Sequence, residues 1–72
     1  MEEFDATLEQ WWYDRKHGII WGQIVGDKKS RWRDYTFIHT SSIKPTGPLK
    51  EGAIVTTRNS KYLLGVKQER ED

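Results

Sequence analysis

The stretch IIWGQIVG at residues 19–26 decides the fold, because it has the clearest β-strand pattern in the chain. β-Branched and aromatic side chains dominate it, as is typical of strands. Gly22 lies inside this run, and a glycine within a strand indicates a bulge or a tight bend. The following DKKS at residues 27–30 is a turn sequence. We therefore expect a strand over residues 19–26.

Three further strands are predicted downstream of this stretch. Residues 44–52 contain both prolines and two glycines, which predicts a loop. Residues 53–57 and 61–66 form a closing hairpin around residues 58–60. Before the loop, residues 31–43 contain a strand in which ring-bearing side chains alternate with others: Tyr35, Phe37 and His39 against Thr36, Ile38 and Thr40.

The segment upstream, residues 8–14, fits two structures. Leu8, Trp11, Trp12 and Arg15 have helical spacing, and the TLEQ at residues 7–10 matches a capping box. However, the WWY sequence favours a strand, and the polar DRKHG at residues 14–18 resembles a hairpin loop that ends in glycine. We favour a strand near residues 8–14, with a short N-terminal helix as the alternative.

Five short strands with one long loop predict an all-β fold, either a small five-stranded curled sheet or an SH3-like barrel. Residues 1–72 then form a single domain, since typical domains are no smaller than about 50 residues. Within it, we expect a loose leader at residues 1–7, a β core at 8–66 and a charged tail at 67–72.

The composition excludes several classes of protein. The chain has no cysteine, which excludes disulfides, thiolate metal sites and cysteine nucleophiles, and favours a cytoplasmic protein. No apolar run is long enough for a membrane span, and the acidic first residues are not a signal peptide. The net charge of +1 gives no global attraction to nucleic acid. Four Trp, three Tyr and two Phe supply the core, in which we expect Trp12 and Trp21.

Short blocks of the sequence resemble a pattern in small phage and prophage proteins. The blocks are WGQIVGD at residues 21–27, RWRD at 31–34, IHTSSI at 38–43 and VTTRNSKYLLG at 55–65. The pattern in those proteins runs G-x-I-x-G-D, R-F-x-D-G-T, I-x-T-S-x-I and T-R-N-S-x-Y-x-L-G. The resemblance covers about residues 8–66. It implies an origin in a mobile element and a role in the contest between phage and host, in the host cytoplasm, and it implies no reaction.

One position departs from that pattern. The phage proteins have Asp-Gly where this chain has Asp34-Tyr35. Without the glycine, the turn has to accept a side chain, and Tyr35 becomes a candidate contact residue.

The sequence does not predict catalysis. No motif places the serines, threonines and two histidines as a nucleophile beside an oriented base, so we predict no catalytic residues and no enzyme. We expect Thr40, Ser41 and Ser42 to cap a strand end, and His39 to pack across strands. Metal ligands lack any recognisable spacing, and the glycines precede no phosphate-binding helix. We therefore expect no metal and no cofactor.

Two clusters mix basic and aromatic side chains, one before the strand at residues 19–26 and one after it. Such clusters contact either single-stranded nucleic acid or proteins. The candidate binding residues are Trp11, Tyr13, Arg15, Lys16, Lys28, Lys29, Arg31, Trp32, Arg33 and Tyr35.

The sequence therefore predicts a small non-catalytic binding protein of phage or prophage type. Its partner is expected to be a host protein, with inhibition of a host defence or transcription machine as the outcome. The alternative partner is single-stranded DNA or RNA, and a third is a nucleotide-like small ligand held between aromatic rings. An exposed aromatic patch is also compatible with a homo-oligomer. Near-zero net charge favours the protein partner, because non-specific affinity for nucleic acid comes mainly from phosphate neutralisation.

Overall fold

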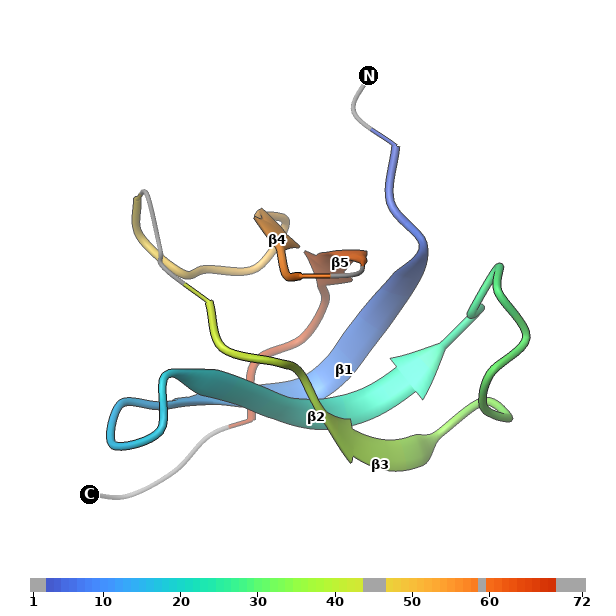
Figure 1. Cartoon of the computed structure of the whole chain (residues 1–72), viewed down its shortest axis with the longest axis horizontal. Helices are drawn as coiled ribbons and strands as arrows, with labels where there is room; N and C mark the ends of the chain where they lie inside the picture. The colour runs from blue at the N-terminus through green and yellow to red at the C-terminus, as the bar shows by residue number, and fades with distance from the viewer. Residues whose placement is uncertain (1–2, 44–46, 59, 69–72) are drawn as a thin grey trace.

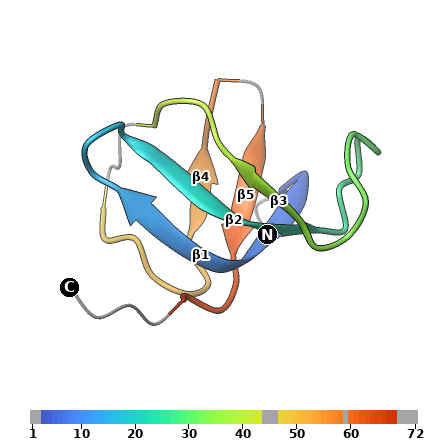
Figure 2. The same cartoon turned by 90° about the horizontal axis from the view of Figure 1, so that it is seen from below.

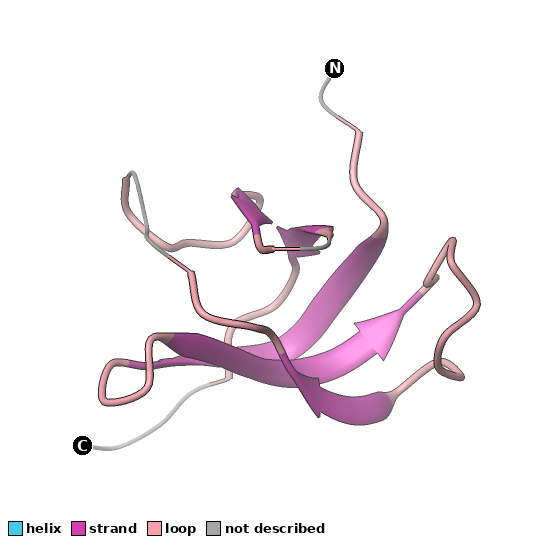
Figure 3. Cartoon of the chain, in the orientation of Figure 1, coloured by secondary structure: helices cyan, strands magenta, loops and turns pink. Residues whose placement is uncertain are grey.

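The computed structural model describes residues 3–43, 47–58 and 60–68. All regular structure in these residues is β (Figure 3), which confirms the all-β class and the strand at the N-terminal segment. Within the described ranges, nothing helical reaches the length and apolar character of a membrane span. The strands are β1 (Ala6–Asp14), β2 (Ile19–Val25), β3 (Thr36–His39), β4 (Ile54–Thr56) and β5 (Lys61–Leu64).

The strands form one mixed sheet in the order β3-β2-β1-β5-β4. β1 pairs antiparallel with β2 and parallel with β5, and the other two pairs are antiparallel. β1 and β2 curve past the β4–β5 hairpin (Figure 1), and the view from below shows the two groups of strands crossing (Figure 2). β3 and β4 end the order without pairing to each other. The sheet is therefore curled but not closed, the first of the two architectures predicted.

Side chains on the inner side of the curl form the core. In β2 the alternation is regular: Ile20 and Ile24 point inward and are fully buried, whereas Trp21 on the other face is only half-buried. Trp11 is the largest fully buried side chain, and its indole Nε1 donates a hydrogen bond to the carbonyl oxygen of Gly65 at 2.9 Å. The buried apolar residues are Ala6, Leu8, Trp11, Ile20, Ile24, Ile38, Ile43, Val55, Tyr62 and Leu64.

A bulge in β1 sets which tryptophan enters the core. The β1–β2 register places Gln10 and Trp11 together opposite Gly22, and Gln10 has a left-handed backbone with φ of 53°. Glycine suits this position, because a Cβ at Gly22 would lie 3.2 Å from both the Glu9 carbonyl oxygen and the Trp11 Cβ, which is a tight contact. The predicted bulge is thus real, but it lies in the partner strand. The extra residue turns Trp11 inward and sends Trp12 to the outer face.

The core begins earlier in the chain than the sequence indicated. Ala6 is fully buried and pairs with Tyr62 of β5, so residues 6 and 7 belong to β1 and not to a loose leader. Before them, the backbone N–H of Asp5 donates to the carbonyl oxygen of Lys61 at 2.8 Å. At the other end, the N–H of Gln68 donates to the carbonyl oxygen of Trp11 at 2.9 Å. Residues 67 and 68 therefore run along β1, and the rest of the predicted tail lies outside the described residues.

The loop between β2 and β3 is fixed by one carboxylate. Asp27 is 1% exposed in its side chain and accepts hydrogen bonds from the backbone N–H groups of Lys29 and Arg31. The guanidinium of Arg31 donates to both oxygens of the same carboxylate, at 3.1 Å each, and to Ser60 Oγ at 2.8 Å. Burial alone would raise the pKa of Asp27, but these hydrogen bonds outweigh it and lower the pKa. The loop is thereby tied to the start of β5.

Candidate functional site

Four rings form a continuous cluster on the outer side of the sheet, which we call the outer aromatic face. It consists of Trp12 from β1, Trp21 from β2, and Phe37 and His39 from β3. The strand register explains the cluster, since Trp12 is opposite Trp21 and Trp21 is opposite His39. Neighbouring side chains on one face of a sheet lie within reach of each other.

The rings of the outer aromatic face lie close together; Trp21 is nearly parallel to Trp12 and to Phe37, whereas His39 is tilted by 54° from Trp21. The centroids of Trp12 and Trp21 are 6.1 Å apart with 14° between the ring planes, and those of Trp21 and Phe37 are 5.5 Å apart with 17°. His39 lies 4.7 Å from Trp21. Phe37 is 53% exposed and the two indoles are half-buried. This side of the sheet therefore presents an aromatic surface, and exposed apolar patches often mark interaction sites.

A carboxylate borders these rings. Asp14 Oδ2 accepts hydrogen bonds from the indole Nε1 of Trp21 at 3.3 Å and from the Nδ1 of His17 at 2.9 Å, with that ring nitrogen protonated. The hydrogen bond from His17 lowers the pKa of Asp14 most, the indole of Trp21 lowers it further, and desolvation opposes both. Asp14 therefore carries a negative charge beside Trp21 at neutral pH.

The predicted cluster after β2 is largely committed to holding its own loop. Arg31 contacts Asp27 and Ser60, and its guanidinium carbon also lies 4.6 Å from the ring centre of Trp32. Lys29 Nζ donates to Ser60 Oγ at 3.1 Å, and Lys28 lies over the ring of Phe4 at 5.0 Å. Trp32, a candidate binding residue, is 38% exposed. Arg33 is exposed, and its carbonyl oxygen accepts the N–H and the hydroxyl of Thr36.

The predicted cluster before β2 divides between the core and the surface. Trp11 is fully buried and was wrongly predicted as a binding residue, because the bulge at Gln10 turns its ring inward. Tyr13 is half-buried against the core. Arg15 and Lys16 are exposed in the turn between β1 and β2.

Among the predicted binding residues, Tyr35 combines high exposure with an unusual backbone conformation. It is 65% exposed and has a left-handed backbone with φ of 69°, a conformation that disfavours side chains and that Gly adopts readily. Its backbone N–H donates to the Ile24 carbonyl oxygen at 2.6 Å, so the position is held firmly. It lies two residues before Phe37 in the chain. Strain at an exposed aromatic residue is a sign of function.

Tyr35→Gly is expected to raise the free energy of unfolding by about 0.5–1 kcal/mol, since relief of about 1–2 kcal/mol of strain exceeds the entropy cost of glycine. The control is Tyr35→Ala, which also removes the ring but keeps a Cβ at positive φ. Urea unfolding of both variants measures the difference. An alanine variant as stable as the glycine variant would show that the backbone there carries no strain.

The structure corrects the assignment of two tryptophans to the core. Trp12 and Trp21 lie half-buried on the outer face, together with Phe37. For Trp21 the sequence indicated this position, because alternation along β2 places Trp21 on the opposite face of the sheet from Ile20 and Ile24. For Trp12 the sequence did not indicate its face, since the bulge in β1 reverses the inward–outward alternation of the residues that follow it. His39 packs across strands against Trp21, as predicted.

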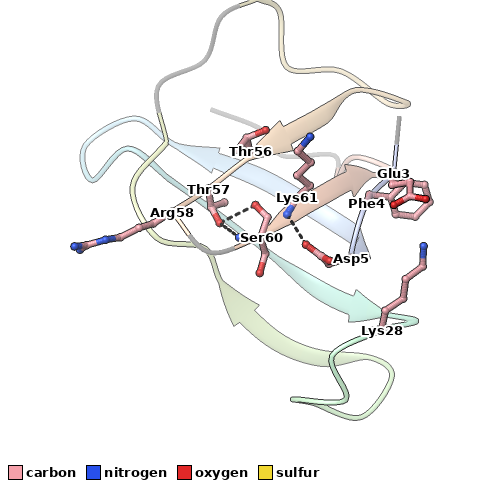
Figure 4. Close-up of a pocket in the computed structure, with 9 residues that line it drawn as sticks. All are labelled: Glu3, Phe4, Asp5, Lys28, Thr56, Thr57, Arg58, Ser60 and Lys61. Atoms are coloured by element: carbon pink, nitrogen blue, oxygen red, sulfur yellow. Dashed lines mark hydrogen bonds between the residues drawn. The ribbon is translucent and has the colours of Figure 1, made fainter. Parts of the chain in front are cut away.

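A shallow depression of about 460 Å³ lies elsewhere, beside the turn between β4 and β5 (Figure 4). Its lining mixes both charges, and the side chain of Arg58 extends away from the other labelled residues. Many of its polar groups are already hydrogen-bonded within the protein. The N–H and the hydroxyl of Thr57 both donate to the Ser60 carbonyl oxygen, and the N–H of Lys61 donates to Asp5. The lining residues are Glu3, Phe4, Asp5, Lys28, Thr56, Thr57, Arg58, Ser60 and Lys61.

The hydroxyl groups that the sequence placed at a strand end hold the backbone. Thr40 Oγ1 accepts the N–H of Ile20 at 3.0 Å and donates to the carbonyl oxygen of Ser41 at 2.8 Å. Ser41 Oγ accepts the N–H of Arg58 at 3.3 Å. Among the described residues, no three His, Asp or Glu side chains come together as metal ligands.

Comparison with known proteins gives no relative: no protein family, no curated protein sequence and no solved structure matches the chain. The function proposed below therefore rests on the residues, their geometry and the resemblance of short sequence blocks to phage proteins.

Proposed function

We propose that this chain is a non-catalytic protein-binding domain of phage or prophage type, which engages a host protein in the host cytoplasm through the outer aromatic face. The cluster of Trp12, Trp21 and Phe37 on an exposed sheet surface carries this proposal. Tryptophan and tyrosine are enriched among the few residues that dominate binding energy at protein interfaces. Inhibition of a host defence or transcription machine is the role that fits the resemblance to phage proteins.

Single-stranded nucleic acid is the second candidate partner. The exposed Arg15 and Lys16 favour it, because they follow Asp14 at the end of the strand that bears Trp12, and exposed rings can stack on bases. Against it, Lys29 and Arg31 near Asp27 donate hydrogen bonds within the protein, to Ser60 and to Asp27. A protein partner accounts better for a ring cluster whose strands carry no cation.

The proposal predicts that Phe37→Ser weakens capture of the host protein by roughly tenfold or more, as expected when an interface anchor is lost. The matched control is Val66→Ser, because Phe37 is 53% exposed and Val66 is 51% exposed, and Val66 is not one of the rings of the outer aromatic face. The measurement is affinity capture from nuclease-treated host extract, with the recovered protein quantified by mass spectrometry.

Thermal unfolding of both serine variants shows whether the fold is retained. Equal capture by Phe37→Ser, Val66→Ser and the parent chain would contradict the proposal. Capture that disappears with nuclease would favour the nucleic-acid partner instead.

A further inference from the structure

The three strands that carry the outer aromatic face contain no lysine or arginine. β1 reads ATLEQWWYD, β2 reads IIWGQIV and β3 reads TFIH. The chain as a whole has 12 basic and 11 acidic side chains, so chance alone would place some cations here. The charged side chains that these strands do carry are Glu9 and Asp14, both on the outward register of β1. The Glu9 carboxylate accepts the N–H of Val66, so the carboxylate that borders the aromatic rings is that of Asp14.

Asp14 holds its charge next to the rings. Its carboxylate accepts the indole N–H of Trp21 at 3.3 Å, and Trp21 in turn lies 5.5 Å from Phe37. A partner group that approaches Phe37 and Trp21 would thus meet aromatic rings with a carboxylate beside Trp21. The faces of aromatic rings attract cations, tryptophan most strongly.

Contacts between a cation and an aromatic ring already occur at two other tryptophans of the chain. Arg31 lies 4.6 Å from the ring centre of Trp32, and Lys67 lies 5.6 Å from that of Trp11. Among the described residues, the contacts of Trp21 and Phe37 are with other rings and with Asp14, and no lysine or arginine covers them. A cation from another molecule can occupy that position.

We propose that the outer aromatic face binds an arginine-containing basic segment of its partner, with a guanidinium stacked on Phe37 and Trp21 and paired with Asp14. Arginine fits better than lysine, because its planar guanidinium stacks on rings and also matches a carboxylate. This inference rests on the proposed function and specifies the chemistry of the partner.

The test uses the full chain labelled with ¹⁵N and follows the indole N–H signals by NMR. The probe is the peptide acetyl-Gly-Arg-Gly-Arg-Gly-amide, and the matched peptides carry glutamine or glutamate in place of arginine. The arginine peptide is expected to shift the signal of Trp21 and to leave that of the buried Trp11 unchanged. Phe37→Ala should weaken this binding roughly fivefold, the loss of one exposed cation–π contact.

Asp14→Asn should lower the affinity for the arginine peptide roughly two- to fivefold, as for an exposed ion pair. This loss of affinity should be smaller at high salt. Asp34→Asn is the control, because Asp34 is an exposed carboxylate that accepts the N–H of Gly26 in the loop. Equal shifts with the glutamine peptide, no shift at millimolar peptide, or a larger shift of Trp21 with oligothymidine would each overturn the inference.

The outcomes separate this inference from the proposed function. If Phe37→Ser abolishes capture of a host protein but no peptide discriminates by charge, the protein-binding face stands and the arginine assignment fails. If Phe37→Ser leaves capture intact, the proposed function fails, whatever the peptides do.

Discussion

Trp11→Ala is expected to lower the free energy of unfolding by about 3–5 kcal/mol, the usual cost of deleting a buried tryptophan. Trp11 is fully buried, lies at the bulge in β1 and donates its indole N–H to Gly65. For a chain of 72 residues, total stability is roughly 4–11 kcal/mol, so this one substitution removes a large part of it. Urea unfolding followed by circular dichroism measures the loss without relying on tryptophan fluorescence.

Trp32→Ala is the control for this prediction. Trp32 is 38% exposed and its main contact is the guanidinium of Arg31, so its loss should cost about 1 kcal/mol or less. If the two variants were equally stable, Trp11 would not be the centre of the core. This comparison also separates the two tryptophans that the sequence alone assigns to one class of binding residue.

Asp27→Ala is expected to lower the free energy of unfolding by about 2–3 kcal/mol, since a buried carboxylate with charged partners is removed. The carboxylate of Asp27 holds both the backbone N–H and the guanidinium of Arg31, which in turn binds Ser60. The loop between β2 and β3 would lose its attachment to β5. Asp34→Ala in the same loop is the control, because Asp34 accepts one backbone N–H at an exposed position and should cost about 1 kcal/mol or less. Equal losses from both substitutions in urea unfolding would contradict this role of Asp27.

The pH dependence of stability tests the same contact. Hydrogen bonds hold the native pKa of Asp27 below its usual value, so its contribution is complete above the unfolded pKa of about 3.9. That contribution is lost as the pH falls through the lower native pKa. Asp27→Asn should therefore flatten part of the acid limb of the stability curve, measured by urea unfolding at a series of pH values. An unchanged acid limb would show that Asp27 has the same pKa in the folded and unfolded states.

The strands were predictable because each has a local pattern. β2 alternates between Ile20 and Ile24 on one face and Trp21 on the other, and β3 alternates around Ile38, so period two identifies both. The start of β1 was not predictable, because Ala6 is buried only through its parallel pairing with β5. Pairing between distant segments leaves no trace in either segment alone.

The candidate site was harder to predict than the fold. Sequence reasoning grouped basic and aromatic residues that are neighbours in the chain, whereas the outer aromatic face joins three strands. The residues of the phage-like blocks mainly hold the backbone: Asp27 fixes a loop, Thr40 binds the N–H of Ile20, and Ser60 accepts Arg31. Trp21 and His39 of these blocks lie on the outer aromatic face instead. Tyr35, next to the block at residues 31–34, is exposed at the position where those proteins have glycine.

The parallel pairing of β1 with β5 also bears on how this chain reaches its native state. Trp11 finds its hydrogen-bond acceptor 54 positions away, and Glu9 accepts the N–H of Val66, 57 positions away. Contacts between such distant segments form only after a large loop has closed, which slows folding compared with local structure. During synthesis, residues 61–68 are made after β1 and β2, so the core that Tyr62 and Leu64 complete beside β1 cannot form before them.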